Sequence, residues 1–136
     1  MNIIFRMIIV ISIIIFCLEW ILPFFDYLWL EQADLDLLNW SGHKSMITIS
    51  PLIYWSMFAI WIFLSVGLFF YYKLARTLFV TYMIVSFLLI PVFGYSVQTP
   101  LYIFLNSAVN MLDGALIAIA FLTDIDSKFE KPMGFD

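Results

Sequence analysis

The chain of 136 residues is 65% hydrophobic and 20% aromatic, and only 12% of its residues are charged. A soluble domain is on average about 45–50% apolar and about 25% charged, so this composition excludes an ordinary soluble core and predicts a protein embedded in a lipid bilayer. The net charge is -4, and the sequence has neither a basic cluster nor a nucleic-acid-binding motif, so no nucleic-acid partner is expected.

The first apolar segment is predicted to span the membrane over residues 3–23. Its end carries Glu19, Trp20 and Pro23, and not the small residues of a signal-peptide cleavage site. We therefore expect an uncleaved anchor that Pro23 ends or kinks. The single cysteine, Cys17, excludes an intramolecular disulfide and is expected to be an inert structural thiol.

Residues 24–50 form the one long connection and are predicted to lie outside the membrane as an amphipathic segment. Acids lie there among leucine and aromatic residues, which suits a short helix at the water–membrane interface. Because the acidic part of this segment lacks the Lys and Arg that hold such helices to anionic lipid, packing on the other spans is an equal alternative. Partner contacts are expected at Trp29, Leu37 and Trp40.

Three further spans are predicted at residues 51–72, 77–96 and 100–123. Two of them begin alike, because Ser50 and Thr99 stand at N-cap positions and a proline follows each one. Pro91 is expected to kink the third span or to end it early. Residues 124–136 carry charges of both signs and are expected to form a solvated tail with little structure.

Together these segments predict an all-α fold, a single membrane domain over residues 1–136 with four antiparallel transmembrane helices. With both termini inside, the outer side keeps one basic residue, Lys44, and the cytoplasmic side carries Arg6, Lys73, Arg76, Lys128 and Lys131. Cytoplasmic connections of membrane proteins are usually rich in Lys and Arg. The predicted location is therefore the cell inner (cytoplasmic) membrane, with the N- and C-termini inside.

Asp113 is the strongest functional signal, because it lies about 18 Å along a helix from Leu101 and so near the membrane midplane. An acid at this depth costs about 2.5–3.5 kcal/mol on insertion scales. Three roles remain open for it: proton- or ion-coupled function, polar packing inside the bundle, or contact with a basic residue of a partner. For polar packing, the expected hydrogen-bond partners are Asn110, Ser86, Tyr82 and Thr81.

Asn106, Asn110 and Asp113 share one face of the fourth span, with Gly114 and Ala118 in an adjoining strip of small residues. Small residues let another helix approach closely, and amide side chains hydrogen-bond across such a contact. We therefore expect a face that either packs against a neighbouring helix or takes part in proton transfer.

Glu19 is a possible second acid of the spans. It lies about 20 Å from Arg6 along the helix, near the outer interface, where its side chain is expected to reach water. The alternative is that Glu19 and Asp113 are two stations of a proton path.

Because His43 is the only histidine and lies in the outer connection, we predict no catalytic residues, no metal site and no cofactor, and hence no enzyme.

Most spans carry few polar residues, which favours packing against lipid or protein over transport. The leading hypothesis is a non-enzymatic subunit, or an accessory or assembly factor, of a larger membrane complex. Its partners are then the lipid bilayer and other membrane protein subunits, or a second copy by self-association. The alternative is a small oligomeric proton-coupled transporter or channel that uses Asp113. The chain is loosely similar to the small multidrug resistance transporters in its size, its four spans and the acid of its first span, Glu19. Those transporters differ from it because their acid lies in the middle of the first span and their connections are short.

Overall fold

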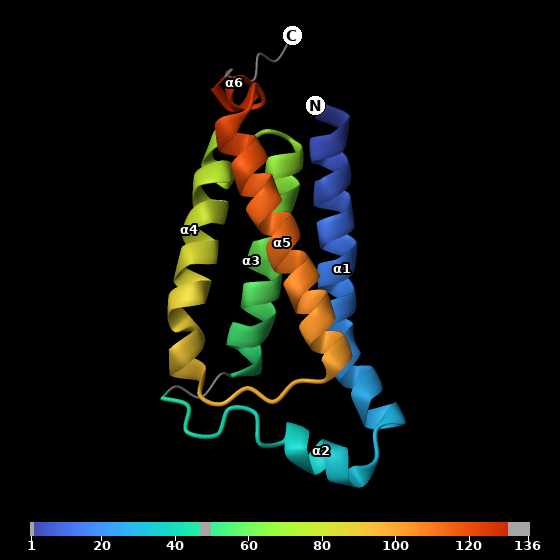
Figure 1. Cartoon of the computed structure of the whole chain (residues 1–136). Coiled ribbons are helices and arrows are strands. Elements are labelled where there is room, and N and C mark those ends of the chain that lie inside the picture. The colour runs from blue at the N-terminus through green and yellow to red at the C-terminus, as the bar shows by residue number, and fades with distance from the viewer. Residues whose placement is uncertain (1, 47–49, 131–136) are drawn as a thin grey trace.

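The computed structural model describes residues 2–46 and 50–130. Four long helices form an antiparallel bundle, as Figure 1 shows: α1 (Asn2–Trp29), α3 (Pro51–Phe69), α4 (Lys73–Leu89) and α5 (Pro100–Leu122). A short 3-10 helix, η1 (Ile90–Phe93), follows α4, and two short helices lie at opposite ends of the bundle, α2 (Gln32–Leu38) and α6 (Asp126–Glu130). No strand occurs among the described residues, and the predicted all-α bundle of four helices is confirmed.

The four long helices, counting α4 and η1 together, are each long and apolar enough to cross a membrane. Their outward surfaces carry large apolar side chains, among them Ile3, Phe63, Phe87 and Phe104, all of which are exposed on the isolated chain. A soluble monomer rarely exposes so much contiguous apolar surface, whereas lipid covers it without cost. The chain has the architecture of a multi-pass membrane protein in a lipid bilayer.

The predicted starts of two spans are confirmed in atomic detail. The Ser50 hydroxyl accepts a hydrogen bond from the Ile53 backbone N–H at 3.3 Å, and the Thr99 hydroxyl accepts one from the Tyr102 N–H at the same distance. A proline occupies the first turn after each cap. The early end of the third span is also confirmed, because α4 ends at Leu89 and gives way to η1.

Three predicted helix bounds are wrong, and one of them is the end of the second span, since α3 ends at Phe69 and not at residue 72. α1 continues past Pro23 to Trp29, because a proline removes one backbone hydrogen bond and the next turn still forms its own, such as that from the Leu30 N–H to the Asp26 carbonyl at 3.0 Å. The third span begins at Lys73 and not at residue 77. The connection between α3 and α4 is short because Tyr71 adopts a positive φ of 59°, which reverses the direction of the chain within this turn.

The predicted solvated tail is wrong for residues 124–130, which fold over one end of the bundle. Ile125 and Phe129 are 1% and 2% exposed, and the Phe129 ring lies 6.2 Å from that of Phe5 and 5.5 Å from that of Tyr71. Ile125 directly precedes α6 and Phe129 lies on it, and both apolar side chains turn toward the core of the bundle. Lys131 and the rest of the predicted tail lie outside the described residues.

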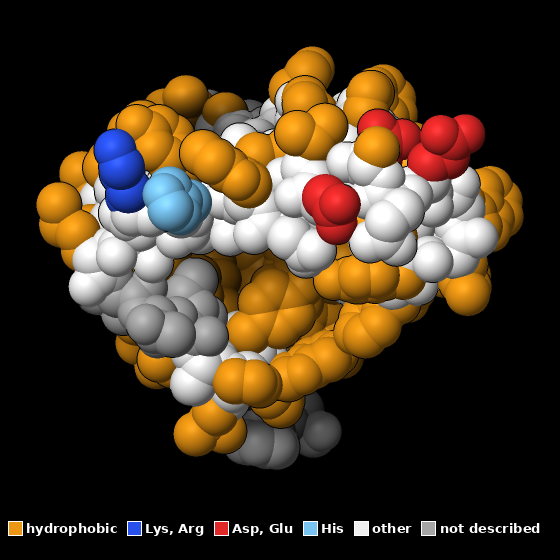
Figure 2. All heavy atoms as spheres, turned by 90° about the horizontal axis from the view of Figure 1, so that it is seen from below, with side chains coloured by type: hydrophobic (Ala, Val, Ile, Leu, Met, Phe, Trp, Pro, Cys, Tyr) orange, Lys and Arg blue, Asp and Glu red, His pale blue; other side chains and the backbone are white. Residues whose placement is uncertain are grey.

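The predicted helix of the long connection is α2, at the opposite end of the bundle from α6 (Figure 1). The residues after α2 pair with the connection between η1 and α5: the Gly42 N–H donates to the Tyr95 carbonyl at 2.7 Å, and the Tyr95 N–H donates to the His43 carbonyl at 3.0 Å. Figure 2 shows this end, where acids lie beside exposed hydrophobic side chains. Trp29, Leu37 and Trp40 are exposed, and their contact with a partner stays a prediction.

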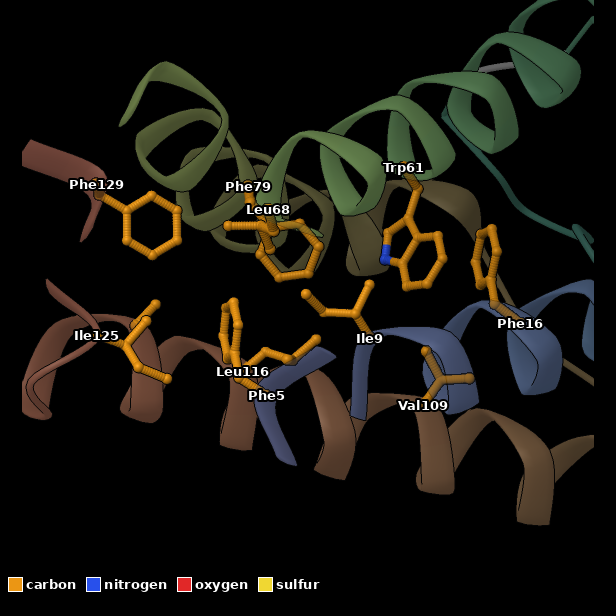
Figure 3. Close-up of a cluster of buried hydrophobic side chains, with 11 residues drawn as sticks. Phe5, Ile9, Phe16, Trp61, Leu68, Phe79, Val109, Leu116, Ile125 and Phe129 are labelled. Carbon is orange, nitrogen blue, oxygen red and sulfur yellow. The ribbon is translucent and has the colours of Figure 1, made fainter. Parts of the chain in front are cut away.

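Large apolar side chains from all four long helices and α6 meet in the core (Figure 3). Trp61 is 2% exposed, and its ring stacks on Phe16 with ring centroids 3.9 Å apart. Near the α6 end, α3 and α4 approach so closely that a Cβ added to Gly67 would lie 2.4 Å from the Cβ of Ala75. A glycine is required there, because any side chain would meet the facing helix.

Candidate functional site

The first and last spans make the most extensive helix–helix interface of the bundle. The buried residues of α1 are Phe5, Ile9, Ser12, Phe16 and Glu19, and those of α5 are Val109, Asp113, Leu116 and Ala120. Both sets alternate steps of three and four residues, the heptad spacing with which two helices pack side chains into each other's gaps. We call this interface the α1–α5 seam. Both predicted acids, Glu19 and Asp113, lie in it.

Asp113 lies at the centre of the bundle and is 0% exposed. Its Oδ1 accepts a hydrogen bond from the Ser12 hydroxyl at 2.9 Å, and its Oδ2 accepts one from the Trp61 indole N–H at 3.1 Å. These three residues, which we call the central cluster, join α1, α3 and α5. Each carboxyl oxygen therefore has a donor from the chain itself, as buried polar groups require.

Glu19 belongs to a second group toward the α2 end of the seam. Its Oε1 accepts a hydrogen bond from the Asn106 amide at 3.0 Å, and the Asn106 oxygen accepts one from the Asn110 amide at 2.6 Å. The Tyr102 side chain also lies within hydrogen-bonding range of the Glu19 carboxyl group. We call Glu19, Asn106 and Asn110 the amide cluster. It joins the first and last spans two turns away from the central cluster.

Glu19 was expected to reach water, but it is only 5% exposed. The expectation fails because α5 supplies donors to its carboxyl group at that depth, so the side chain need not extend to the interface. Glu19 and Asp113 stay in separate clusters among the described residues, with Phe16 and Val109 as an apolar layer between them along the seam. The two predicted stations of a proton path are thus not joined by a direct hydrogen bond.

The predicted face of α5 divides into two parts. Asn106 and Asp113 point into the seam, whereas Asn110, Gly114 and Ala118 are exposed. A Cβ added to Gly114 would have no atom within 4 Å. Only part of the predicted face is therefore open to another helix.

None of the partners expected for Asp113 forms one of its hydrogen bonds. Tyr82 donates to the Met57 carbonyl at 3.2 Å, and Thr81 donates to the Thr77 carbonyl at 3.0 Å. Both lie on α4, which makes a much smaller interface with α5 than α1 does. The two residues that do bind Asp113, Ser12 and Trp61, were not predicted. Ser12 could have been found from its heptad spacing to Glu19 in an otherwise apolar run.

Comparisons of the chain with protein-family models, with curated proteins and with solved structures find no match. Its role is therefore argued from the geometry of the two clusters and of the surfaces around them.

A double-mutant cycle tests whether the amide cluster joins α1 to α5. We expect Glu19→Ala and Asn106→Ala to be coupled by about 0.6–1.7 kcal/mol in the free energy of unfolding, the range for interhelical hydrogen bonds in membranes. Unfolding in mixed micelles with increasing dodecyl sulfate measures it. Ser107→Ala, at an exposed neighbouring position, is the control: with Glu19→Ala it should be additive within about 0.5 kcal/mol. Additivity in the Glu19–Asn106 cycle would show that their contact contributes nothing.

Proposed function

We propose that this chain is a non-enzymatic subunit or assembly factor of a larger complex in the cell inner membrane. Its binding surface for a partner's transmembrane helix is the outward strip of α5, which we define as Ser107, Asn110, Gly114 and Ala118. The observation that carries the proposal is that this strip is exposed at bilayer depth and combines an amide with small residues. Elsewhere the outward surface of the bundle is dominated by bulky apolar side chains.

The chemistry of Asn110 supports this proposal. Its amide nitrogen donates to Asn106, and the same side chain still presents a carbonyl oxygen and a second N–H toward the exterior. Lipid cannot bond these groups, whereas a polar group of another helix can. The open space at Gly114 lets that helix approach closely.

The central cluster supports a subunit over the alternative transporter. Asp113 is fully buried and both of its oxygens accept hydrogen bonds from the chain's own side chains. In this arrangement it packs three helices together and has no contact with water. A proton carrier instead needs access to water from each side in turn.

Filling the outward strip should abolish partner binding. We expect Gly114→Leu and Ala118→Leu to reduce co-purification of other membrane proteins at least tenfold after gentle detergent extraction, because leucine keeps the facing helix at a distance. Ser56→Leu is the matched control, since Ser56 is a small exposed residue on α3. Proteins that co-purify are identified by mass spectrometry. A wild-type chain that purifies alone as a monomer, or equal losses in the control, would contradict the proposal.

The basic residues support the orientation with both termini inside. Arg6, Lys73, Arg76 and Lys128 belong to the end where α1 begins and α6 lies, whereas Lys44 belongs to the α2 end (Figure 1). Such a bias marks the cytoplasmic side in most membrane proteins.

Cysteine labelling tests this orientation in a Cys17→Ala background. We expect Ser45→Cys to react with a membrane-impermeant maleimide on whole cells, and Ser127→Cys to react only after the cells are permeabilised. The two positions lie at the α2 end and on α6, so they report opposite sides. Labelling of Ser127→Cys alone on intact cells would reverse the assignment.

A further inference from the structure

An apolar groove of about 340 Å³ runs along the first turns of α1 beside the end of α3. Its walls are Ile3, Arg6, Met7, Val10, Ile11 and Phe69. It is open on the lipid-facing surface and lies at the α6 end of the bundle. Five of its six lining residues are apolar, so its body suits a hydrocarbon chain.

One cation lies in the wall of this groove. The Arg6 guanidinium carbon is 4.9 Å from the centre of the Phe69 ring and 5.2 Å from that of Tyr71, so the two rings hold an otherwise exposed side chain in place. Within the described residues, Arg6 forms no ion pair with a carboxylate. The guanidinium keeps its N–H donors for a ligand, and its planar fork matches the oxygens of a phosphate or a carboxylate group.

A second groove repeats this construction between α3 and α4. It has a volume of about 480 Å³, and its walls are apolar apart from Tyr72 and one cation, Lys73. Lys73 is the first residue of α4, so this cation also lies at the α6 end of its groove. Two grooves on different helix pairs thus share one construction. Each has apolar walls that face the lipid and one positive charge at the α6 end of the bundle.

We propose that the α1–α3 groove is a binding site for an anionic phospholipid. The lipid's phosphate lies against Arg6, and the upper part of one acyl chain lies along Met7, Val10 and Ile11. Basic pockets on the cytoplasmic side of transmembrane helices bind anionic headgroups in this way. The charge complementarity selects the headgroup, and the apolar wall selects a lipid over a soluble phosphate.

Native mass spectrometry tests the site on the full chain in micelles that contain equal amounts of phosphatidylglycerol and phosphatidylcholine. We expect wild-type protein to retain phosphatidylglycerol over phosphatidylcholine by roughly fivefold, since one basic group near an anionic surface contributes about that factor. Arg6→Gln should lower this ratio of phosphatidylglycerol to phosphatidylcholine toward one. Lys44→Gln, which removes one charge at the α2 end, is the matched control and should keep the wild-type ratio.

A second variant keeps the charge and fills the groove. Met7→Trp should lower retention of phosphatidylglycerol although Arg6 is intact, and circular dichroism checks that both variants keep their helices. Equal ratios in wild-type protein and Arg6→Gln, or an equal loss in Lys44→Gln, would overturn the proposal. Retention of inorganic phosphate by the wild-type protein, without retention of phosphatidylglycerol, would show a phosphate site and not a lipid site. Loss of a co-purifying protein in Met7→Trp, with unchanged lipid retention, would make the groove a helix-docking surface instead.

Discussion

Asp113→Leu is expected to lower the free energy of unfolding by about 1–3 kcal/mol, whereas Asp113→Asn is expected to keep most of the stability. Leucine removes the acceptor of the buried Trp61 N–H, and an indole N–H can only donate a hydrogen bond. The Ser12 hydroxyl can turn to a carbonyl of its own helix, so it loses less. An asparagine oxygen can accept from Trp61 while its amide donates to the Ser12 oxygen.

Unfolding in mixed micelles, followed by tryptophan fluorescence, measures both variants. Trp61→Phe combined with Asp113→Leu should cost less than the sum of the single changes, because the unpaired N–H is then gone. Asp34→Leu, on the exposed face of α2, is the control and should stay within about 0.5 kcal/mol of wild type. If Asp113→Asn lowered the free energy of unfolding as much as Asp113→Leu, the carboxyl group itself would be required. That result would favour the alternative of a proton-coupled transporter.

Gly67→Ala is the second change with a large expected effect. The new Cβ would lie 2.4 Å from the Cβ of Ala75, so α3 and α4 must separate next to their connection. Overpacking of this kind costs about 1–3 kcal/mol. Ala75→Gly vacates the space, so the double variant should be more stable than Gly67→Ala alone, even though a glycine in a helix costs about 1 kcal/mol.

Gly114→Ala is the matched control for this test, since a Cβ at that position meets no atom within 4 Å. In the purified chain it should be neutral or stabilising by up to about 1 kcal/mol, because alanine favours the helix. The same micelle titration compares all four variants. Equal behaviour of Gly67→Ala and Gly114→Ala would mean that α3 and α4 do not pack as closely as described.

The sequence predicted most of the helix starts because their signals are local. Ser50 and Thr99 need only the next few residues to cap a helix, and the structure has both caps. The early end of the third span near Pro91 is local in the same sense. The fold class followed from composition and from the length of the apolar runs.

The candidate site was predicted only in part, because its partners are set by which helices are neighbours. The sequence marked Asp113 as a polar residue in a span, but it did not reveal that α1 and α3 lie against it. For the same reason Glu19 was assigned to the interface, although Asn106 lies opposite it in the seam. The burial of Phe129 likewise depends on rings from α1 and the α3–α4 turn.

The α1–α5 seam has a consequence for biosynthesis. The ribosome delivers α1 first and α5 last, so Ser12 and Glu19 enter the bilayer before their seam partners exist. The α3–α4 hairpin can close meanwhile, because only a short turn separates its helices. Until α5 enters the bilayer, the Glu19 carboxyl group lacks its Asn106 donor. Insertion of α5 is thus the step that completes both polar clusters of the seam.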